Sequence, residues 1–306
     1  SYTNVFSKVL CDIGKNNHKV VAITAAMADG TGLSRFAKCF PQRFFDVGIA
    51  EEHALTFAAG LAAGGMKPVV ALYSSFLQRA FDQTIHDICM QNLPVMIAVD
   101  RAGLVGNDGE THQGAFDLSF LSMIPNMTVL SPKNRWELAD MTRFCVEYDD
   151  PVALRYPRGE AYEGMGEFRA PIVYGKSEIL YEEESIALVF VGHMAELAES
   201  VRNELKAMGY SCTLVNARFV KPLDTELLEH LSKDHRLVVT MEENVLTGGF
   251  GSQVLNFVSE AGLPLHICNI GIPDEFVEQG NVDVLRREIG LEKSAAVQRI
   301  IDEYAK

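Results

Sequence analysis

Two carboxylates and a histidine stand together in the stretch FDVGIAEEHALTFAAGLAAGG (45–65), where a strand-like run gives way to a helix-like one. On a helix, Glu51 lies at the head of an apolar stripe. The stripe continues, at spacings of four, three and four residues, through Leu55, Ala58 and Ala62. A carboxylate on an apolar surface is costly to desolvate unless something pairs with it, and a ligand nitrogen could be that partner.

The same helix start has a simpler interpretation. Negative side chains in the first turn of a helix favour the positive end of its dipole, by about 0.3–1 kcal/mol each. This effect accounts for Glu52 and could account for Glu51, and we interpret His53 as structural. The alanines and glycines further along would let another helix approach closely, which predicts a tight packing surface that could join two subunits.

The composition narrows the classes of function. The chain has 306 residues, enough for two domains, and a formal net charge of −14, which argues against general binding to nucleic acid or a membrane surface. A small anionic substrate needs only a local group of Arg or Lys. The six scattered cysteines, with no CxxC, are typical of reduced thiols in a cytoplasmic protein. The chain opens at Ser1 without Met, so we expect a processed chain or a fragment.

Strand-like and helix-like segments alternate, which predicts an α/β protein with two open, mostly parallel sheets. The expected strands are short, apolar and β-branched, as in sheets buried on both faces. They cover 19–27, 67–75, 93–103, 126–132, 151–159, 185–192, 211–220, 236–244 and 263–273. A Gly-, Glu- and Pro-rich stretch breaks the rhythm, so we place domains at 1–160 and 172–306 and a linker at 161–171.

Polar side chains gather at or just after the ends of three of these strands, where ligands of parallel sheets bind. One such group is unremarkable, but several from separate strands suggest a site. They are Tyr73, Arg79, Arg101, Asp108, His112 and Arg158. Phe76 follows the strand 67–75 as well, although a core aromatic is the ordinary interpretation there. Each arginine alone could equally form a surface ion pair.

The longer motifs carry a resemblance. The stretch 45–65 resembles the pyrimidine-binding domain of thiamine-diphosphate enzymes of the transketolase superfamily. Three later stretches narrow it to the 1-deoxy-D-xylulose 5-phosphate synthases: YSSFLQRAFDQTIHDI (73–88), DRAGLVGNDGETHQGAFDLSFL (100–121) and RYPRG (155–159). Transketolases share the outline of the DGxTHQ loop without its DRAG and GAFD flanks. The rest of the chain resembles the C-terminal domain of the family, which mainly supports the dimer.

The resemblance implies roles for these residues. Glu51 would face the aminopyrimidine ring of thiamine diphosphate and support its imino tautomer, and Phe76 would stack on that ring. His112 would contact the reacting substrate, and Arg79 would lie among the substrate-binding residues. The clamp on the phosphate of D-glyceraldehyde 3-phosphate would be Arg101 and Arg158, because the guanidinium fork suits phosphate. Tyr73 and Asp108 would line the acceptor pocket.

A further part of such enzymes has no counterpart in the sequence. They bind Mg²⁺ and the diphosphate through a GDG motif and an Asn some 30 residues later, and no GDG occurs here. We therefore expect half an active site, inactive alone, with Mg²⁺ bound by an absent N-terminal domain or a second chain. The glycines at 248–251 precede a helix and resemble an anion-binding loop, although ordinary strand-to-helix turns also carry glycines.

The expected reaction joins pyruvate, after loss of CO₂, to D-glyceraldehyde 3-phosphate, and supplies isoprenoid, thiamine and pyridoxal synthesis. A homodimer is the expected assembly, with no nucleic acid or membrane partner. Two alternatives stay open. The chain could be the smaller subunit of a split transketolase, which uses sugar phosphates instead of pyruvate. It could also be a non-catalytic subunit that keeps only the dimer surface.

Overall fold

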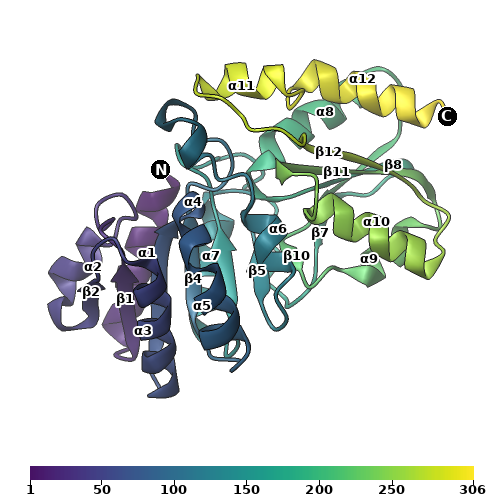
Figure 1. The fold of residues 1–306 in the computed structure, drawn as a ribbon. Helices are drawn as coiled ribbons and strands as arrows, with labels where there is room; N and C mark the ends of the chain where they lie inside the picture. Colours follow the sequence, from purple (N-terminus) through teal and green to yellow (C-terminus); the bar gives the residue numbers. More distant parts are fainter.

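The computed structural model describes all residues from 1 to 306, arranged as two sheets, each with helices on both faces (Figure 1). The first sheet has seven strands in the order β10-β5-β6-β4-β3-β1-β2. Their bounds are β1 (Val20–Thr24), β2 (Phe44–Asp46), β3 (Lys67–Tyr73), β4 (Met96–Asp100), β5 (Thr128–Leu130), β6 (Val152–Arg155) and β10 (Phe219–Lys221). All neighbours are parallel except β10 and β5, so the predicted sheet type is confirmed.

The strands of this sheet are apolar on both faces because both faces are covered. In β1, Val21 and Ile23 face the core beneath α3, whereas Val20 and Ala22 face the core beneath α1 and α7. The helices of this part are α1 (Tyr2–Asn16), α2 (Ser34–Cys39), α3 (Glu51–Ala63), α4 (Ser74–Leu77), α5 (Phe81–Gln83), α6 (Asp117–Ser122) and α7 (Arg135–Glu147). The region between β3 and β4 is not one continuous helix but consists of α4, a 3₁₀ turn, α5 and a π-helix (Thr84–Cys89).

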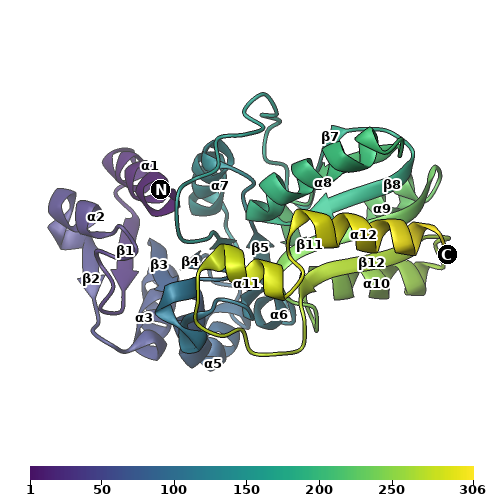
Figure 2. The ribbon, with the colours of Figure 1, turned by 90° about the horizontal axis from the view of Figure 1, so that it is seen from above.

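The second sheet has five strands in the order β12-β11-β8-β9-β7. They are β7 (Glu178–Tyr181), β8 (Ser185–Phe190), β9 (Cys212–Asn216), β11 (His235–Val245) and β12 (His266–Ile272). Their helices are α8 (Ala195–Ala207), α9 (Thr225–Leu231), α10 (Phe250–Ala261), α11 (Val282–Glu288) and α12 (Lys293–Tyr304). Helices α8, α11 and α12 lie on one side and α9 and α10 on the other (Figures 1 and 2). No helix is long and apolar enough to cross a membrane.

The expected single strand at 211–220 is wrong. Strand β9 ends at Asn216, the backbone turns at Arg218 with φ of +56°, and β10 then joins the first sheet beside β5. The local pattern is apolar on both sides of the turn, so it gives no sign that the chain changes sheets. The second half of the chain therefore completes the first sheet, and the two sheets share one continuous apolar cluster.

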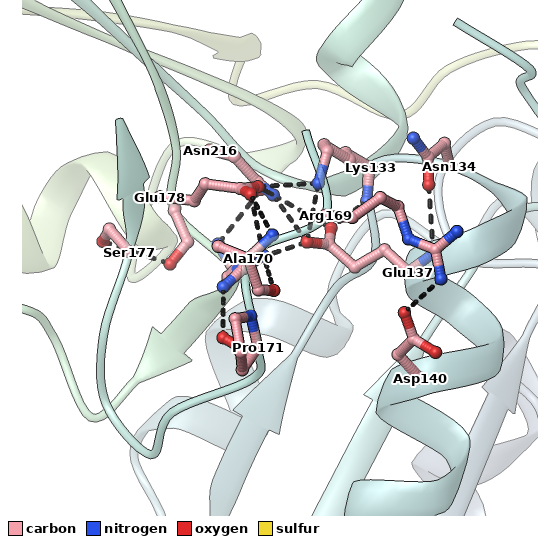
Figure 3. Close-up of polar contacts among 12 residues, drawn as sticks. Lys133, Asn134, Glu137, Asp140, Arg169, Ala170, Pro171, Ser177, Glu178 and Asn216 are labelled. Carbon is pink, nitrogen blue, oxygen red and sulfur yellow. Dashed lines mark hydrogen bonds and ion pairs between the residues drawn. The ribbon is translucent and has the colours of Figure 1, made fainter. Parts of the chain in front are cut away.

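A buried ionic network fixes this crossing (Figure 3). The carboxylate of Glu137 on α7 accepts hydrogen bonds from Lys133 Nζ at 2.9 Å and from Arg218 Nε at 2.8 Å. Asn216 Nδ2 lies 2.9 Å from the other oxygen of Glu137, and Lys133 Nζ also contacts Glu178 at 2.6 Å. All five side chains are buried, so the network ties α7 to the second sheet through charges that satisfy one another.

Candidate active site

Glu51 opens α3 at the carboxyl edge of the first sheet and is only 1 % exposed. Leu55, Ala58 and Ala62 are buried below it, so the predicted stripe is confirmed. One carboxylate oxygen, Oε1, accepts a hydrogen bond from Arg79 Nη1 at 2.8 Å, whereas Oε2 is buried without a partner. An unpaired buried carboxylate oxygen is costly, and Oε2 is free to accept a hydrogen bond from a group outside the chain.

The other acidic residue of this turn behaves differently. Glu52 points outward and is exposed, as is His53, whose ring stacks at 5.9 Å on Phe57. The small residues Ala58 and Ala62 pack inside the domain core, whereas Gly60 and Ala63 are exposed, so a subunit contact through this helix stays a prediction.

Aromatic rings lie beside Glu51. Phe76, in α4 just after β3, stacks on Tyr73 with ring centroids 5.5 Å apart and meets the edge of His112 at 5.3 Å. The guanidinium of Arg79 lies over the ring of Phe76, 5.0 Å from its centroid. Phe76 is thus a partly exposed ring within a polar cluster, and the interpretation as an ordinary core aromatic is wrong.

Arg101 lies directly after β4, in the left-handed region with φ of +57°. Its guanidinium lies 3.9 Å from the ring centroid of Tyr73 and donates to the carbonyl of Gly30 at 2.7 Å. Burial raises the pKa of Tyr73, and the Arg101 charge opposes that shift. Asp100 beside it is fully buried, and burial raises its pKa to about 6 although Arg101 and Thr3 favour the charged form. The side chain of Arg101 is therefore mostly buried, and its guanidinium hydrogen bonds to the protein are made through Nη1.

Arg158 is much more open, with about half of its side chain exposed. It follows β6 and forms an ion pair with Asp108 at 2.5 Å, beside a cleft of about 260 Å³. Asp108 and Arg158 also influence the pKa of Tyr73 through their charges, which places them near the aromatic cluster. All the sequence-predicted residues therefore gather at one edge of the first sheet, brought there by α3, β3, β4 and β6.

Sequence reasoning missed a buried support for this edge. Arg155, at the end of β6, donates from Nε to Asp117 at 2.6 Å, and Asp117 accepts from Ser74 Oγ at 3.0 Å. Arg155 Nη2 also donates to the carbonyl of Glu243 at 2.6 Å. Arg155 and Asp117 stand inside the quoted RYPRG and GAFD stretches, so the motifs themselves could have pointed to them. They lie beneath the site and are fully buried.

The glycine loop at 248–251 already holds an anion from its own chain. The carboxylate of Glu242 accepts from the backbone N–H groups of Phe250 and Gly251, both at 2.8 Å, at the start of α10. Burial raises the pKa of Glu242 to about 7, and these two hydrogen bonds oppose the shift. The loop therefore resembles an anion site because it caps a helix with an internal carboxylate.

The arrangement of sheets is that of transketolase-type proteins. A chain described as a split-gene transketolase in an inactive beta4 tetramer superposes with a TM-score of 0.89 at 30% identity, covering 99% of this chain and 98% of that one. Transketolase from Campylobacter jejuni superposes with a TM-score of 0.83 over 98% of this chain and 46% of its own, at 18% identity, which concerns the fold alone.

Family models agree with the fold. Residues 1–163 match the model for the transketolase pyrimidine binding domain, and residues 175–295 match the transketolase C-terminal domain. The chain belongs to the transketolase family. A protein of Lachnoclostridium phytofermentans named 1-deoxy-D-xylulose-5-phosphate synthase is 55% identical over 98% of this chain. The chain spans about half the length of the curated relatives it matches, 48% in this case.

Proposed function

We propose that this chain is the pyrimidine-binding and C-terminal portion of a 1-deoxy-D-xylulose 5-phosphate synthase. That thiamine-diphosphate-dependent transferase condenses pyruvate, with loss of CO₂, with D-glyceraldehyde 3-phosphate. The similarity to synthases across nearly the whole chain supports this choice. The observation that carries it is the buried, unpaired Oε2 of Glu51 beside the ring of Phe76.

The residues present fit the aminopyrimidine end of thiamine diphosphate. A hydrogen bond between a ring nitrogen and Oε2 of Glu51, with one shared proton, would satisfy the only free oxygen of that carboxyl. Arg79 holds the other oxygen at 2.8 Å and so fixes the orientation of the carboxyl. Phe76 offers an aromatic face for stacking. When bound, the cofactor would supply the carbon nucleophile that protein side chains lack.

The phosphate of the acceptor substrate would be bound by Arg158, the more exposed of the two arginines. Arg158 is committed to a single carboxylate, and a guanidinium has five N–H donors in a fixed fork, so it retains donors for a phosphate. Arg101 would contribute charge and hold Tyr73 in place. Asp108 and Tyr73 would then line the pocket, and His112, at the edge of the Phe76 ring, would contact the reacting substrate.

The remaining parts of the proposal concern the assembly. No group of three or more His, Cys, Asp or Glu side chains in the chain is arranged to hold a metal ion. We place Mg²⁺ and the diphosphate on an N-terminal domain or second chain that completes the site, within a homodimer. The division into domains 1–160 and 172–306 with a linker at 161–171 is part of this proposal. All six cysteines are free thiols, which supports a cytoplasmic location.

The test joins this chain to the part of the Lachnoclostridium phytofermentans relative that it does not span. With thiamine diphosphate, Mg²⁺, pyruvate and D-glyceraldehyde 3-phosphate, the joined protein should release CO₂ and form a five-carbon ketose phosphate. The 306-residue chain alone, titrated with cofactor by calorimetry, should bind weakly. Micromolar binding by the chain alone would show that the diphosphate site is misplaced.

A smaller subunit of a split transketolase is the second candidate, supported by the 30% identical chain that this one covers almost completely. The donor decides between the two. A split transketolase would transfer a two-carbon unit from a ketose phosphate and leave pyruvate untouched. A non-catalytic subunit would assemble with its partner in sedimentation experiments and use neither donor.

A further inference from the structure

A second buried carboxylate joins the C-terminal sheet to the candidate site. Glu243, in β11, is fully buried, and its carboxylate accepts three hydrogen bonds. Oε2 accepts from the backbone N–H of Leu104 at 3.0 Å and from His193 Nε2 at 2.7 Å, and Oε1 accepts from Arg286 Nε at 2.6 Å. We propose that Glu243 is a positioning residue for the loop 103–114, which carries Asp108 and His112, so that the C-terminal region sets acceptor use. The acceptor part rests on the proposed function.

The charges around Glu243 keep it ionised. Burial alone would raise its pKa, but the charge of Arg286 and the hydrogen bonds from Arg286 and His193 outweigh burial and hold the pKa well below its usual range. Burial lowers the pKa of His193, so the imidazole is neutral and donates its Nε2 proton to the carboxylate. A charged acceptor in a dry site makes the hydrogen bond from Leu104 stronger than a neutral one.

The loop is built to receive this carboxylate. Gly103 has φ of +82°, and a Cβ there would lie 2.2 Å from Oε2 of Glu243, so only glycine lets the carboxylate reach Leu104. Gly103 and Gly114 exchange two backbone hydrogen bonds, each of 2.7 Å, which close the base of the loop. Glu243 therefore contacts the loop at its base. The base begins at Gly103, two residues after Arg101.

The loop is also held by the segment before α11. Gln113 Nε2 donates to the carbonyl of Glu278 at 3.0 Å, and Gln279 Nε2 donates to the carbonyl of Asn107 at 3.0 Å. That segment leads into α11, whose Arg286 is bound to Glu243. The Glu243 carboxylate thus contacts the base of the loop directly. Through Arg286 it also contacts the helix that follows the segment bound to Asn107 and Gln113.

Hydrogen exchange on the 306-residue chain tests the positioning, with Glu242 as matched control. Glu242 is the preceding residue, equally buried, but it caps α10 and does not contact the loop. E243Q should accelerate exchange of amides 104–113 by roughly tenfold or more, because loss of a charge-assisted hydrogen bond favours local opening, whereas E242Q should not. Equal loop exchange in the two variants, or acceleration spread evenly over the chain, would overturn the proposal.

If E243Q fails to fold, Arg286 provides the same test. Arg286→Met should loosen the loop and Arg286→Lys should restore most of the protection, and unchanged loop exchange in Arg286→Met would contradict the proposal. In the joined synthase, E243Q should raise the KM for D-glyceraldehyde 3-phosphate about tenfold and leave acceptor-free CO₂ release from pyruvate unchanged. Equal losses in both steps would make Glu243 merely structural. An inactive wild-type joined protein would count against the proposed function alone, since exchange is read without catalysis.

Discussion

Glu51 and Glu137 are both buried glutamates in the first turns of helices, but their hydrogen-bond partners differ. Glu137 has every oxygen satisfied, by Lys133, Asn216 and Arg218, and it ties the two sheets together (Figure 3). Glu51 has one hydrogen bond, from a half-exposed arginine, and one buried oxygen with none.

The difference separates a carboxylate that ties the fold together from one to which the proposed function assigns the cofactor. A fully satisfied buried network rigidifies the fold, and removal of one member leaves an uncompensated charge. A half-satisfied carboxylate costs stability until a ligand completes it. Burial alone would have ranked the two residues as equals, so the partner of each oxygen is the informative quantity.

The largest expected effect is on turnover. In the joined synthase, Glu51→Gln should keep the fold and lower kcat by about 10²–10⁴-fold, the range for a general acid–base group. Gln keeps the size of the side chain but cannot supply the carboxyl proton. Steady-state CO₂ release measures the loss, and near-normal activity would return Glu51 to a helix-dipole role.

The next largest effect is expected from Glu137 and concerns the free energy of unfolding. Glu137→Ala should lower the free energy of unfolding by about 3–5 kcal/mol, because Lys133 and Arg218 stay buried without their carboxylate. Urea unfolding of the 306-residue chain measures it. Glu147→Ala, at the exposed end of the same helix, is the control and should stay within about 0.5 kcal/mol. Glu51→Gln should cost at most about 1.5 kcal/mol, and an equal loss for Glu51 and Glu137 would erase the comparison.

Arg158→Ala should reduce kcat/KM for D-glyceraldehyde 3-phosphate about 10- to 100-fold, since a charge-assisted contact contributes roughly 1.5–3 kcal/mol. Arg135→Ala removes a similarly exposed arginine, paired with Glu163, and should have no effect. An acceptor aldehyde without phosphate should be used equally by wild type and Arg158→Ala. A loss with that aldehyde as well would mean that Arg158 supports the fold. Arg101→Ala is a less clear test because it also removes the contact with Tyr73.

A fall in pH should weaken the buried ionic network around Glu137, because Glu178 in that network becomes protonated. Burial would raise its pKa, but the hydrogen bond and charge of Lys133 and the charge of Arg218 outweigh burial and hold the pKa below its ordinary value of 4.5. Its stabilising contribution is therefore present above that value and lost as the pH falls through the lower, folded-state pKa. Urea midpoints measured from pH 6 down to pH 4 and below should fall less steeply in Glu178→Gln than in wild type. Parallel curves would contradict this assignment.

The smallest expected effect belongs to the neighbour of Glu51. Glu52 is exposed at the same helix start, so Glu52→Gln should cost only about 0.3–1 kcal/mol of stability and leave turnover of the joined synthase unchanged. Paired urea and activity measurements check both. A large loss of activity would show that the two glutamates share one role.

The features that sequence predicted well are those with a local physical cause. Most strands of both sheets were predictable because they are buried on both faces, which makes their sequences unbroken apolar runs. Helices α1, α2 and α6 and strand β7 were missed, and β10 was not separated from the strand expected at 211–220. Strand β7 is an edge strand with alternating burial, and β10 is only three residues long and directly follows the turn at Arg218.

By itself, the sequence determined that Glu51 heads an apolar stripe and that Tyr73, Arg101 and Arg158 follow strand ends, because helix and strand periods are properties of neighbouring residues. Only the tertiary structure decided which carboxylates are satisfied. Glu137 meets Arg218 across 81 residues of sequence, and Glu243 meets Leu104 across 139. Hydrogen-bond partners so distant are selected by how the sheets pack, and no local periodicity encodes them.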